Sequence, residues 1–428
     1  MTDTICAPAT AAGGALTIVR ISGEEAIDRV SAIFSHDLTK AQPRTVHYGH
    51  IHTPEGDIVD EVLVSIFRAP HSYTGENAAE ITLHGSPYIT QTTLRLLIEA
   101  GCRMAEPGEF TKRAFMHGRL DLTQAEAVAD LIASRNAASH RVAMTQLRGA
   151  MRTELENLRQ QLLHLTTLLE LELDFSDHED LEFAPRNHLL QLTQQLHRHV
   201  QALADTFSTG DAIKNGIPVA IVGAPNVGKS TLLNALLGEQ RAIVSDIEGT
   251  TRDTIEDTVL IGQTEFRFID TAGLRHTADS IEQLGQERTR AAAERAHIII
   301  MLTEPGVPFP TDITPRSDQT VLRIVNKTDT FRAIDGTGLD TLRRQLADAA
   351  PHLAATDVVV TSARHYEALL RAADNLARVE QGLSSNLTPD LVAEDLRHAI
   401  AHLGDITGGA ITPQETLINL FSHFCVGK

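Results

Sequence analysis

The chain has no tryptophan, few aromatic residues and only three cysteines. Aromatic residues make up 4% of its 428 residues, so a platform of side chains that stack on nucleic-acid bases is not expected. Cys6, Cys102 and Cys425 lack the spacing of a disulfide framework or a zinc site. No signal-peptide pattern follows Met1, and no apolar run approaches the ~20 residues of a transmembrane helix. These absences predict a soluble, cytoplasmic protein with no membrane partner.

Positive charge is also scarce. The chain carries 37 Lys and Arg against 56 Asp and Glu, for a formal net charge of −19. A protein of this charge repels a polyanion, whereas an independent nucleic-acid-binding domain is usually basic. A role on RNA would therefore require a local basic patch or a partner protein.

The pattern of apolar residues divides the chain into four parts. Residues 1–117 mix short β-type runs (16–19, 61–66 and 79–83) with a helical pattern at 91–100, which predicts an α+β domain. Residues 118–212 are helical, with Thr123 and Glu126 at capping-box spacing, a long periodic segment at 140–173 and a third helix from Pro185 to about residue 207. Strands and helices alternate through 213–352.

Residues 353–428 are helical again. Thr388 and Thr412 are each a cap residue followed by a proline at the first helical position. Helices on both sides of an α/β block suggest that the block is inserted into a bundle whose two halves pack together. The fold class expected is therefore a multidomain α/β plus α protein.

A complete phosphate-binding loop follows the apolar strand 219–222. Residues 223–230 match GxxxxGK[ST], and a helix-like segment follows at 231–237. In such a loop backbone N–H groups wrap the phosphates, Lys229 supplies a positive charge and the Ser230 hydroxyl ligates Mg²⁺. The residues expected at the phosphates are Asn226, Val227, Gly228, Lys229, Ser230 and Thr231.

Two later motifs favour GTP over ATP. Asp270-Thr271-Ala272-Gly273 follows the predicted strand 265–269 and places a carboxylate near the Mg²⁺ shell. Asn326-Lys327-Thr328-Asp329 follows the apolar run 321–325, and its aspartate can accept from the N1–H and the amine of guanine. Residues 249–253 lie between the phosphate loop and the first of these motifs as a candidate switch loop, although a plain polar loop remains an alternative. The order of motifs predicts an inserted Ras-like phosphate-loop GTPase domain with a mostly parallel sheet.

The catalytic group departs from the Ras-type pattern. Leu274 occupies the position at which Ras-type enzymes carry the glutamine that orients water. No arginine finger can be identified, so another cation is needed. Glu282, on a short helical stretch, is a candidate for orienting water, with a solvated helix face as the alternative.

Three further segments, 107–111, 118–127 and the C-terminal Phe424-Cys425-Val426-Gly427-Lys428, resemble signatures of the MnmE (TrmE) family of tRNA-modification GTPases. The resemblance covers the whole chain. It implies a folate-binding-like, dimerising N-terminal domain, a homodimer, and GTPase domains that pair with potassium in place of an arginine finger.

The resemblance also implies roles for individual residues. Potassium would be held by Asn226, Ser245, Ile247 and Thr250, and Mg²⁺ by Ser230 and Thr251. Further GTP contacts would come from Ser245, Asp246, Ile247, Glu248, Gly249, Thr250 and Thr251. Folate would be bound by Arg20, Glu80, Arg119 and Lys428. Glu282 would orient water, and Cys425 would serve modification, unless it is only a small buried hydrophobe.

In the family, GTP hydrolysis controls addition of an aminomethyl-type group, such as carboxymethylaminomethyl, to C5 of the wobble uridine of certain tRNAs. The implied one-carbon donor is 5-formyl- or 5,10-methylene-tetrahydrofolate. The implied partner is the flavoprotein MnmG (GidA), carrying FAD, in a heterotetramer or larger complex. Two rival interpretations remain open: a regulatory GTPase that switches ribosome or RNA assembly, and a folate-dependent transferase with an idle GTPase domain.

The position of the last guanine-contacting loop also has two candidates. Thr361-Ser362-Ala363-Arg364 follows the strand-like 358–360, but the residues after it resemble re-entry into the helical domain. We therefore expect the loop at Arg332-Ala333, with a shortened connection after Asp329. The Pro-rich stretch 304–315 is expected to replace a helix.

Overall fold

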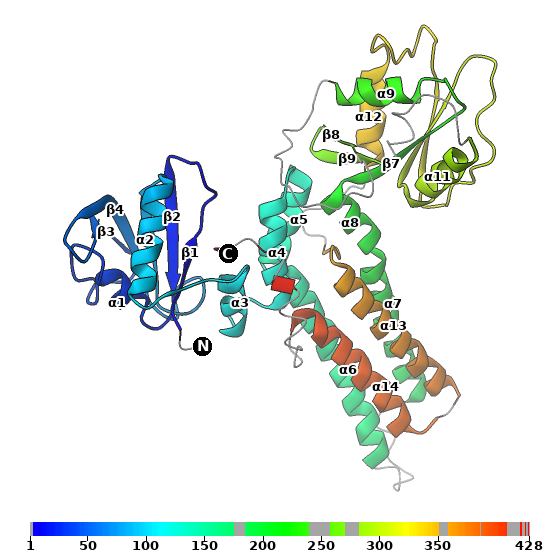
Figure 1. Ribbon diagram of the computed structural model, residues 1–428. Helices are drawn as coiled ribbons and strands as arrows, with labels where there is room; N and C mark the ends of the chain where they lie inside the picture. Colours follow the sequence, from blue (N-terminus) through cyan, green and yellow to red (C-terminus); the bar gives the residue numbers. More distant parts are fainter. Residues whose placement is uncertain are drawn as a thin grey trace. The chain divides into compact units, whose positions relative to one another are not determined.

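Figure 1 shows the computed structural model of the chain, which describes residues 3–174, 185–238, 257–269, 282–350, 358–385, 387–408, 420–421, 424 and 427. Internal contacts divide the chain into two compact units, Met1–Ala129 with Leu403–Lys428, and Asp130–His402. The four domain ranges expected from the sequence remain predictions.

The first unit is built on a six-stranded sheet of order β3-β4-β5-β2-β1-β6. All neighbouring strands are antiparallel except β1 and β6, which are parallel. The strands are β1 (Ile5–Pro8), β2 (Leu16–Ser22), β3 (Thr45–His52), β4 (Ile58–Phe67), β5 (Ala78–His84) and β6 (Arg103–Met104). The three β-type runs expected from the sequence therefore form β2, β4 and β5.

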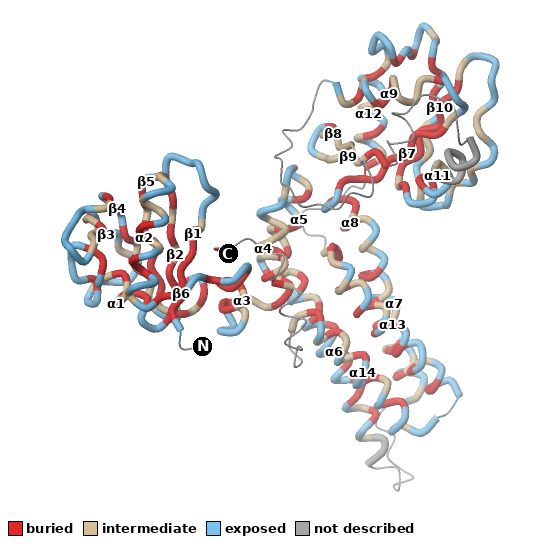
Figure 2. The backbone as a smooth tube through the Cα atoms, in the orientation of Figure 1, coloured by how far each residue is buried: buried red, intermediate tan, exposed pale blue. Residues whose placement is uncertain are grey.

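Alternation along the strands gives this sheet one apolar face. Val62, Val64 and Ile66 of β4 are buried, whereas Leu63 between them is exposed. The buried face packs against α1 (Ala26–Ser31) and α2 (Pro87–Glu99), as the distribution of burial in Figure 2 shows. The helix expected at 91–100 is thus α2, which begins earlier because Pro87 suits a first helical turn.

Two more helices follow in the first unit, α3 (Glu109–Met116) and α4 (Leu122–Ala133), the second of which continues into the next unit. The capping box at the start of α4 is not the expected Thr123 with Glu126. Asp121 Oδ1 accepts from the Gln124 amide at 2.8 Å, and Gln124 Oε1 accepts from the Asp121 amide at 3.1 Å. Asp121, and not Thr123, is the N-cap because its carboxylate directly precedes the first helical turn.

The second unit contains a five-stranded sheet of order β11-β10-β7-β9-β8. Only the β8–β9 pair is antiparallel, so the expected mostly parallel sheet is confirmed. The strands are β7 (Ile217–Val222), β8 (Asp257–Ile261), β9 (Thr264–Phe268), β10 (Ile298–Thr303) and β11 (Thr320–Val325).

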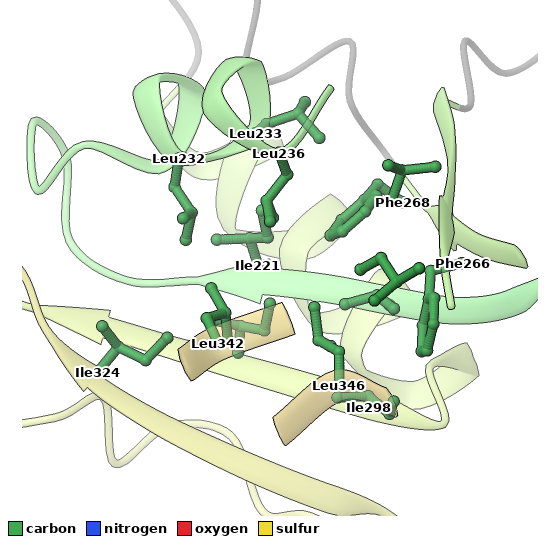
Figure 3. Packing of buried hydrophobic residues seen from close by; sticks show 14 of the residues in the cluster. Ile221, Leu232, Leu233, Leu236, Phe266, Phe268, Ile298, Ile324, Leu342 and Leu346 are labelled. Atoms are coloured by element: carbon green, nitrogen blue, oxygen red, sulfur yellow. The ribbon is translucent and has the colours of Figure 1, made fainter. Parts of the chain in front are cut away.

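Helices cover both faces of this sheet. Ile221, Phe266 and Ile298 pack against α9 (Lys229–Leu237) and α12 (Leu339–Ala349), the packing seen in Figure 3. On the other face, Ala220, Val222 and Ile299 contact α11 (Glu282–Arg295). Residues 304–319, all of them described, contain no helix, as the proline content predicts.

The remaining helices of the second unit come from both sides of this α/β block. They are α5 (Ala137–Leu147), α6 (Ala150–Asp174), α7 (Arg186–Asp205), α8 (Phe207–Asn215), α13 (Ala363–Ser384) and α14 (Pro389–Thr407), whose last turn belongs to the first unit. α7 lies along α13 (Figure 1), and His197 Nδ1 lies 2.7 Å from Glu380 Oε1. Packing of a helix before the block on one after it confirms the expected insertion.

Two local expectations were wrong. The segment 140–173 is two helices, because Gly149 takes a φ of 85° between α5 and α6. Residues 358–360 are not a strand. The helix expected from Pro185 to about residue 207 is confirmed as α7, and α8 begins after Thr206. Within the described residues, no helix combines the length and apolarity needed to cross a bilayer.

Candidate functional site

The loop between β7 and α9 has a backbone that only particular residues can adopt. Gly228 has a φ of 95°, and a Cβ there would lie 2.5 Å from Asn326 Nδ2. A Cβ on Gly223 would lie 2.2 Å from the Leu302 carbonyl oxygen. Asn226 also takes the left-handed region, with a φ of 62°, which asparagine tolerates better than most residues. The path of the loop therefore requires glycine at positions 223 and 228.

The loop leads directly into α9. Because Lys229, Ser230 and Thr231 form its first turn, their N–H groups have no acceptor within the helix. These N–H groups and the helix dipole create a positive potential, which suits a phosphate group.

Lys229 closes over this loop. Its Nζ donates to the carbonyl oxygens of Gly223 at 2.8 Å and Ala224 at 2.9 Å. Burial lowers the pKa of the Lys229 ammonium. A negative group in the loop would favour the charged form and offset that shift.

Asn326 ties three segments of the second unit together. Its side chain is buried; Nδ2 donates to the Val227 carbonyl at 2.8 Å, and Oδ1 accepts from the Ala333 amide at 3.0 Å. The phosphate loop, the segment 326–329 and the segment 332–333 thus meet at one side chain. Of the two candidate loops, the geometry favours Arg332-Ala333, since Ser362 precedes α13 as its N-cap and Thr361 bonds to Gln146 at 3.1 Å.

Lys327 and Asp329 of the same motif are exposed. Lys327, with a φ of 61°, donates to Glu304 Oε2 at 2.6 Å and to the Asn226 carbonyl at 3.4 Å. The Asp329 carboxylate is fully exposed, and Arg332 Nη2 lies 3.4 Å from its Oδ1. The Asp329 carboxylate is therefore accessible to a base.

The structure describes only part of the expected site. The residues outside the described ranges are Ser245, Asp246, Ile247, Glu248, Gly249, Thr250, Thr251, Asp270, Thr271, Ala272, Gly273, Cys425 and Lys428. Glu282 begins α11, but its side chain is not described.

In the first unit, the expected folate residues Arg20 and Glu80 lie opposite each other on β2 and β5. Arg20 donates through Nε at 2.9 Å and Nη2 at 2.8 Å to Glu80 Oε1. Its guanidinium also lies 5.3 Å from the centre of the Tyr73 ring and 5.7 Å from that of Phe110, within cation–π range.

Arg119 is exposed, and its Cγ lies 3.2 Å from where a Cβ on Gly75 would be. It therefore packs beside the loop that follows Tyr73. Tyr73 could not be identified from the sequence, because a lone tyrosine in a loop has many roles.

The strand, glycine-rich loop and helix around Lys229, set in a parallel sheet with helices on both faces, define a phosphate-loop nucleotide-binding protein. Two family profiles match: "GTP-binding protein TrmE N-terminus" over residues 4–119 and "MnmE helical domain" over residues 122–425.

The chain is 48% identical to the tRNA modification GTPase MnmE of Bacteroides fragilis, with 100% of this chain and 99% of the relative covered. It is 47% identical to that of Parabacteroides distasonis, with both chains covered completely. The chain belongs to the MnmE family of tRNA modification GTPases.

Proposed function

We propose that this protein hydrolyses GTP and that hydrolysis controls folate-dependent modification of the wobble uridine of tRNA, together with the flavoprotein MnmG. The observation that carries the GTPase part is Asn326, whose side chain joins the phosphate loop to the segments at Asp329 and Ala333. A triphosphate and a guanine can therefore be bound by one rigid framework. The tRNA part rests on relatives named tRNA modification GTPase MnmE.

Triphosphate binding would use the first turn of α9. The N–H groups of that turn would donate hydrogen bonds to the β-phosphate, and Lys229 would exchange two carbonyl acceptors for phosphate oxygens. The half-buried Ser230 stands beside Lys229 on the same turn, which fits a Mg²⁺ ligand. Bound Mg²⁺ neutralises charge that develops on the phosphates. Thr251 and Asp270 would complete this part.

Guanine selection would depend on the exposed Asp329 carboxylate, which accepts from N1–H and from the exocyclic amine. Asn326 holds the preceding backbone in place by its two hydrogen bonds. Ala333, rather than Ala363, would provide the last loop beside the base.

Hydrolysis would need a cation in place of the missing arginine. The exposed side chain of Asn226 at the mouth of the phosphate loop fits a potassium ligand, with Ser245, Ile247 and Thr250 as its proposed companions. Potassium supplies positive charge near the transferred phosphoryl group. Glu282, at the start of α11, would orient the attacking water.

The folate site would lie in the first unit. The Arg20–Glu80 pair offers both donors and an acceptor at one place, which fits a polar ring such as a pterin. Arg119 and Lys428 would bind the glutamate tail, and folate supplies a one-carbon unit.

Val46, Tyr48 and Leu63 expose apolar surface on β3 and β4, which supports homodimerisation through this sheet. Cys425 would act in modification, FAD would reside on MnmG, and the complex would work in the cytoplasm.

The decisive test is Lys229→Ala. GTP turnover should fall by roughly 100-fold or more, because a preorganised cation at the transferred phosphoryl is lost. Lys214→Ala is a matched control, since Lys214 pairs with Asp130 on the helical part of the same unit. Turnover within a few-fold of the unsubstituted protein in Lys229→Ala would exclude this loop as the GTPase site.

Two further measurements test the hydrolytic details. Sodium in place of potassium should lower both turnover and GTP-dependent dimerisation of the GTPase domains; equal rates in both salts would exclude the potassium site.

Glu282→Ala should slow hydrolysis and spare GTP binding. Equal loss of both would remove Glu282 from its role.

Deletion of residues 425–428 distinguishes a role in tRNA modification from that of a regulatory assembly switch. Turnover of GTP should be retained, whereas wobble-uridine modification in cells should disappear. Persistent modification would contradict the proposed role of Cys425 and Lys428.

A further inference from the structure

The described residues of the C-terminal segment, taken as residues 420–428, contact the N-terminal part of the first unit at two separate points. One point is apolar and involves Phe421 and Phe424. The other is a backbone contact at Gly427. Residues about 400 positions apart in sequence therefore meet inside one compact unit.

The apolar point is closely fitted around Gly108. Phe421 is buried with Leu122 and Ala125, and its ring lies 5.3 Å from that of Phe424. A Cβ on Gly108, the N-cap of α3, would lie 2.6 Å from the Phe421 carbonyl oxygen and 2.9 Å from Phe424 Cβ. Gly108 therefore lets the segment approach α3 directly.

The second point is fitted around Gly427, which is buried and has a φ of +93°. A Cβ there would lie 2.1 Å from the Pro8 carbonyl oxygen and 3.0 Å from Ala9 Cα. Both neighbours are backbone atoms at the end of β1, so they cannot move aside as a flexible side chain could. Only glycine fits this seat without displacing the strand.

Gly427 also contacts a cation. Arg20 Nη1 donates to the Gly427 carbonyl at 3.2 Å, while Nε and Nη2 of the same guanidinium contact Glu80. Glu80 holds one edge of the guanidinium and Gly427 the other. Tyr73 and Phe110 lie within cation–π range.

We propose that Gly427 is a positioning residue: its side-chain-free backbone seats the C-terminal segment on Pro8, and its carbonyl fixes the orientation of the Arg20 guanidinium. The proposal deepens the proposed function in one respect, since it rests on Arg20 as a folate contact. Seating of the segment and readiness of Arg20 to bind are then one event, because the same hydrogen bond serves both.

The seat can be tested without any ligand. Because the chain contains no tryptophan, Phe424→Trp introduces a single fluorescent reporter into the full-length protein. Adding Gly427→Ala should shift its emission to the red and make it more accessible to acrylamide. Gly56→Ala is the matched control, since Gly56 also has a positive φ, +96°, but open space around its Cβ position. It should leave the emission unchanged.

Hydrogen exchange of the chain without the tryptophan gives a second measurement in case the reporter disturbs packing. Peptides from residues 420–428 should exchange faster in Gly427→Ala than in Gly56→Ala. If neither measurement distinguishes the two alanine variants, the seat at Pro8 does not exist.

Action through Arg20 requires a double-mutant cycle on 5-formyltetrahydrofolate binding. Gly427→Ala alone should weaken binding roughly tenfold, the order of one hydrogen bond to a charged group. In an Arg20→Gln background it should have little further effect, because the two changes remove the same interaction. Additive losses would overturn the positioning role. If the unsubstituted protein binds no folate, the proposed folate site fails, while fluorescence and exchange still decide the seat.

Discussion

The two regions that carry the proposed ligands hold their cations in different ways. Lys229 stands on a contiguous loop and donates to two uncharged carbonyls only six and five residues before it. Arg20 is paired with the Glu80 carboxylate 60 residues away and with a carbonyl 407 residues away. The first cation keeps its charge available for an anion, whereas the second is largely neutralised.

This difference indicates what each region can bind. An ammonium held by neutral oxygens, next to free helix N–H groups, favours a polyphosphate. A guanidinium already paired with a carboxylate favours a polar ring that both donates and accepts. It also means that the first unit depends on long-range ion pairs, whereas the phosphate loop depends on local backbone geometry.

The largest expected effect breaks the ion-pair network of the first unit. Arg113 is completely buried and donates to Asp3 Oδ1 at 2.9 Å, Glu76 at 3.2 Å and Glu109 at 3.0 Å. Arg113→Ala removes the arginine that pairs with the buried Glu76 and one of the two arginines that bind Glu109. It should lower the free energy of unfolding by about 3–5 kcal/mol.

Tyrosine fluorescence can follow denaturant unfolding, because Tyr48, Tyr73 and Tyr88 belong to the first unit and only Tyr366 to the second. Arg152→Ala, which removes a half-exposed pair with Glu156, is the control and should cost at most about 0.5 kcal/mol. GTP turnover should be retained at temperatures where Arg113→Ala is folded. Equal destabilisation in both variants would mean that the buried network contributes no more than a surface pair.

The next effect concerns the second unit and should be confined to ligand choice. Asp329→Asn replaces an acceptor for guanine by an amide that can donate to the oxygen of xanthine. GTP affinity should fall by roughly 100-fold, the order of two charge-assisted hydrogen bonds, and xanthosine triphosphate should bind better than GTP. Competition with a fluorescent nucleotide measures both.

Asp340→Asn is the matched control for this change. Asp340 is exposed in the first turn of α12, and its replacement removes the same formal charge. It should leave the preference for guanine unaltered. Retained guanine preference in Asp329→Asn would place the base elsewhere on the domain.

The same contrast explains what the sequence could predict. The path of the phosphate loop follows from consecutive residues, so β7, Gly228 and α9 were expected nearly at their observed positions. The position of Ala333 was expected only as one of two alternatives, because Asn326 reaches it through a contact that no spacing rule specifies. Tyr73 and the Pro8 seat of Gly427 were not expected at all, since they arise from tertiary packing. The break at Gly149 was missed because its apolar periodicity continues across it.

The smallest expected effect is a pH dependence of the stability of the first unit. Burial by itself would raise the pKa of Glu109, but hydrogen bonds from Arg103, the Glu106 amide and Arg113 outweigh it, so the pKa lies below its ordinary value. The unfolded chain therefore takes up this proton first. The stability contributed is fully present above about pH 4.3 and is lost as the pH falls through the folded-state pKa. The free energy of unfolding, followed by tyrosine fluorescence, should decline in this pH range. Glu109→Gln should make the slope of this free energy against pH shallower, by an amount that corresponds to less than one bound proton. Identical slopes would show that Glu109 carries no part of the acid sensitivity of the first unit.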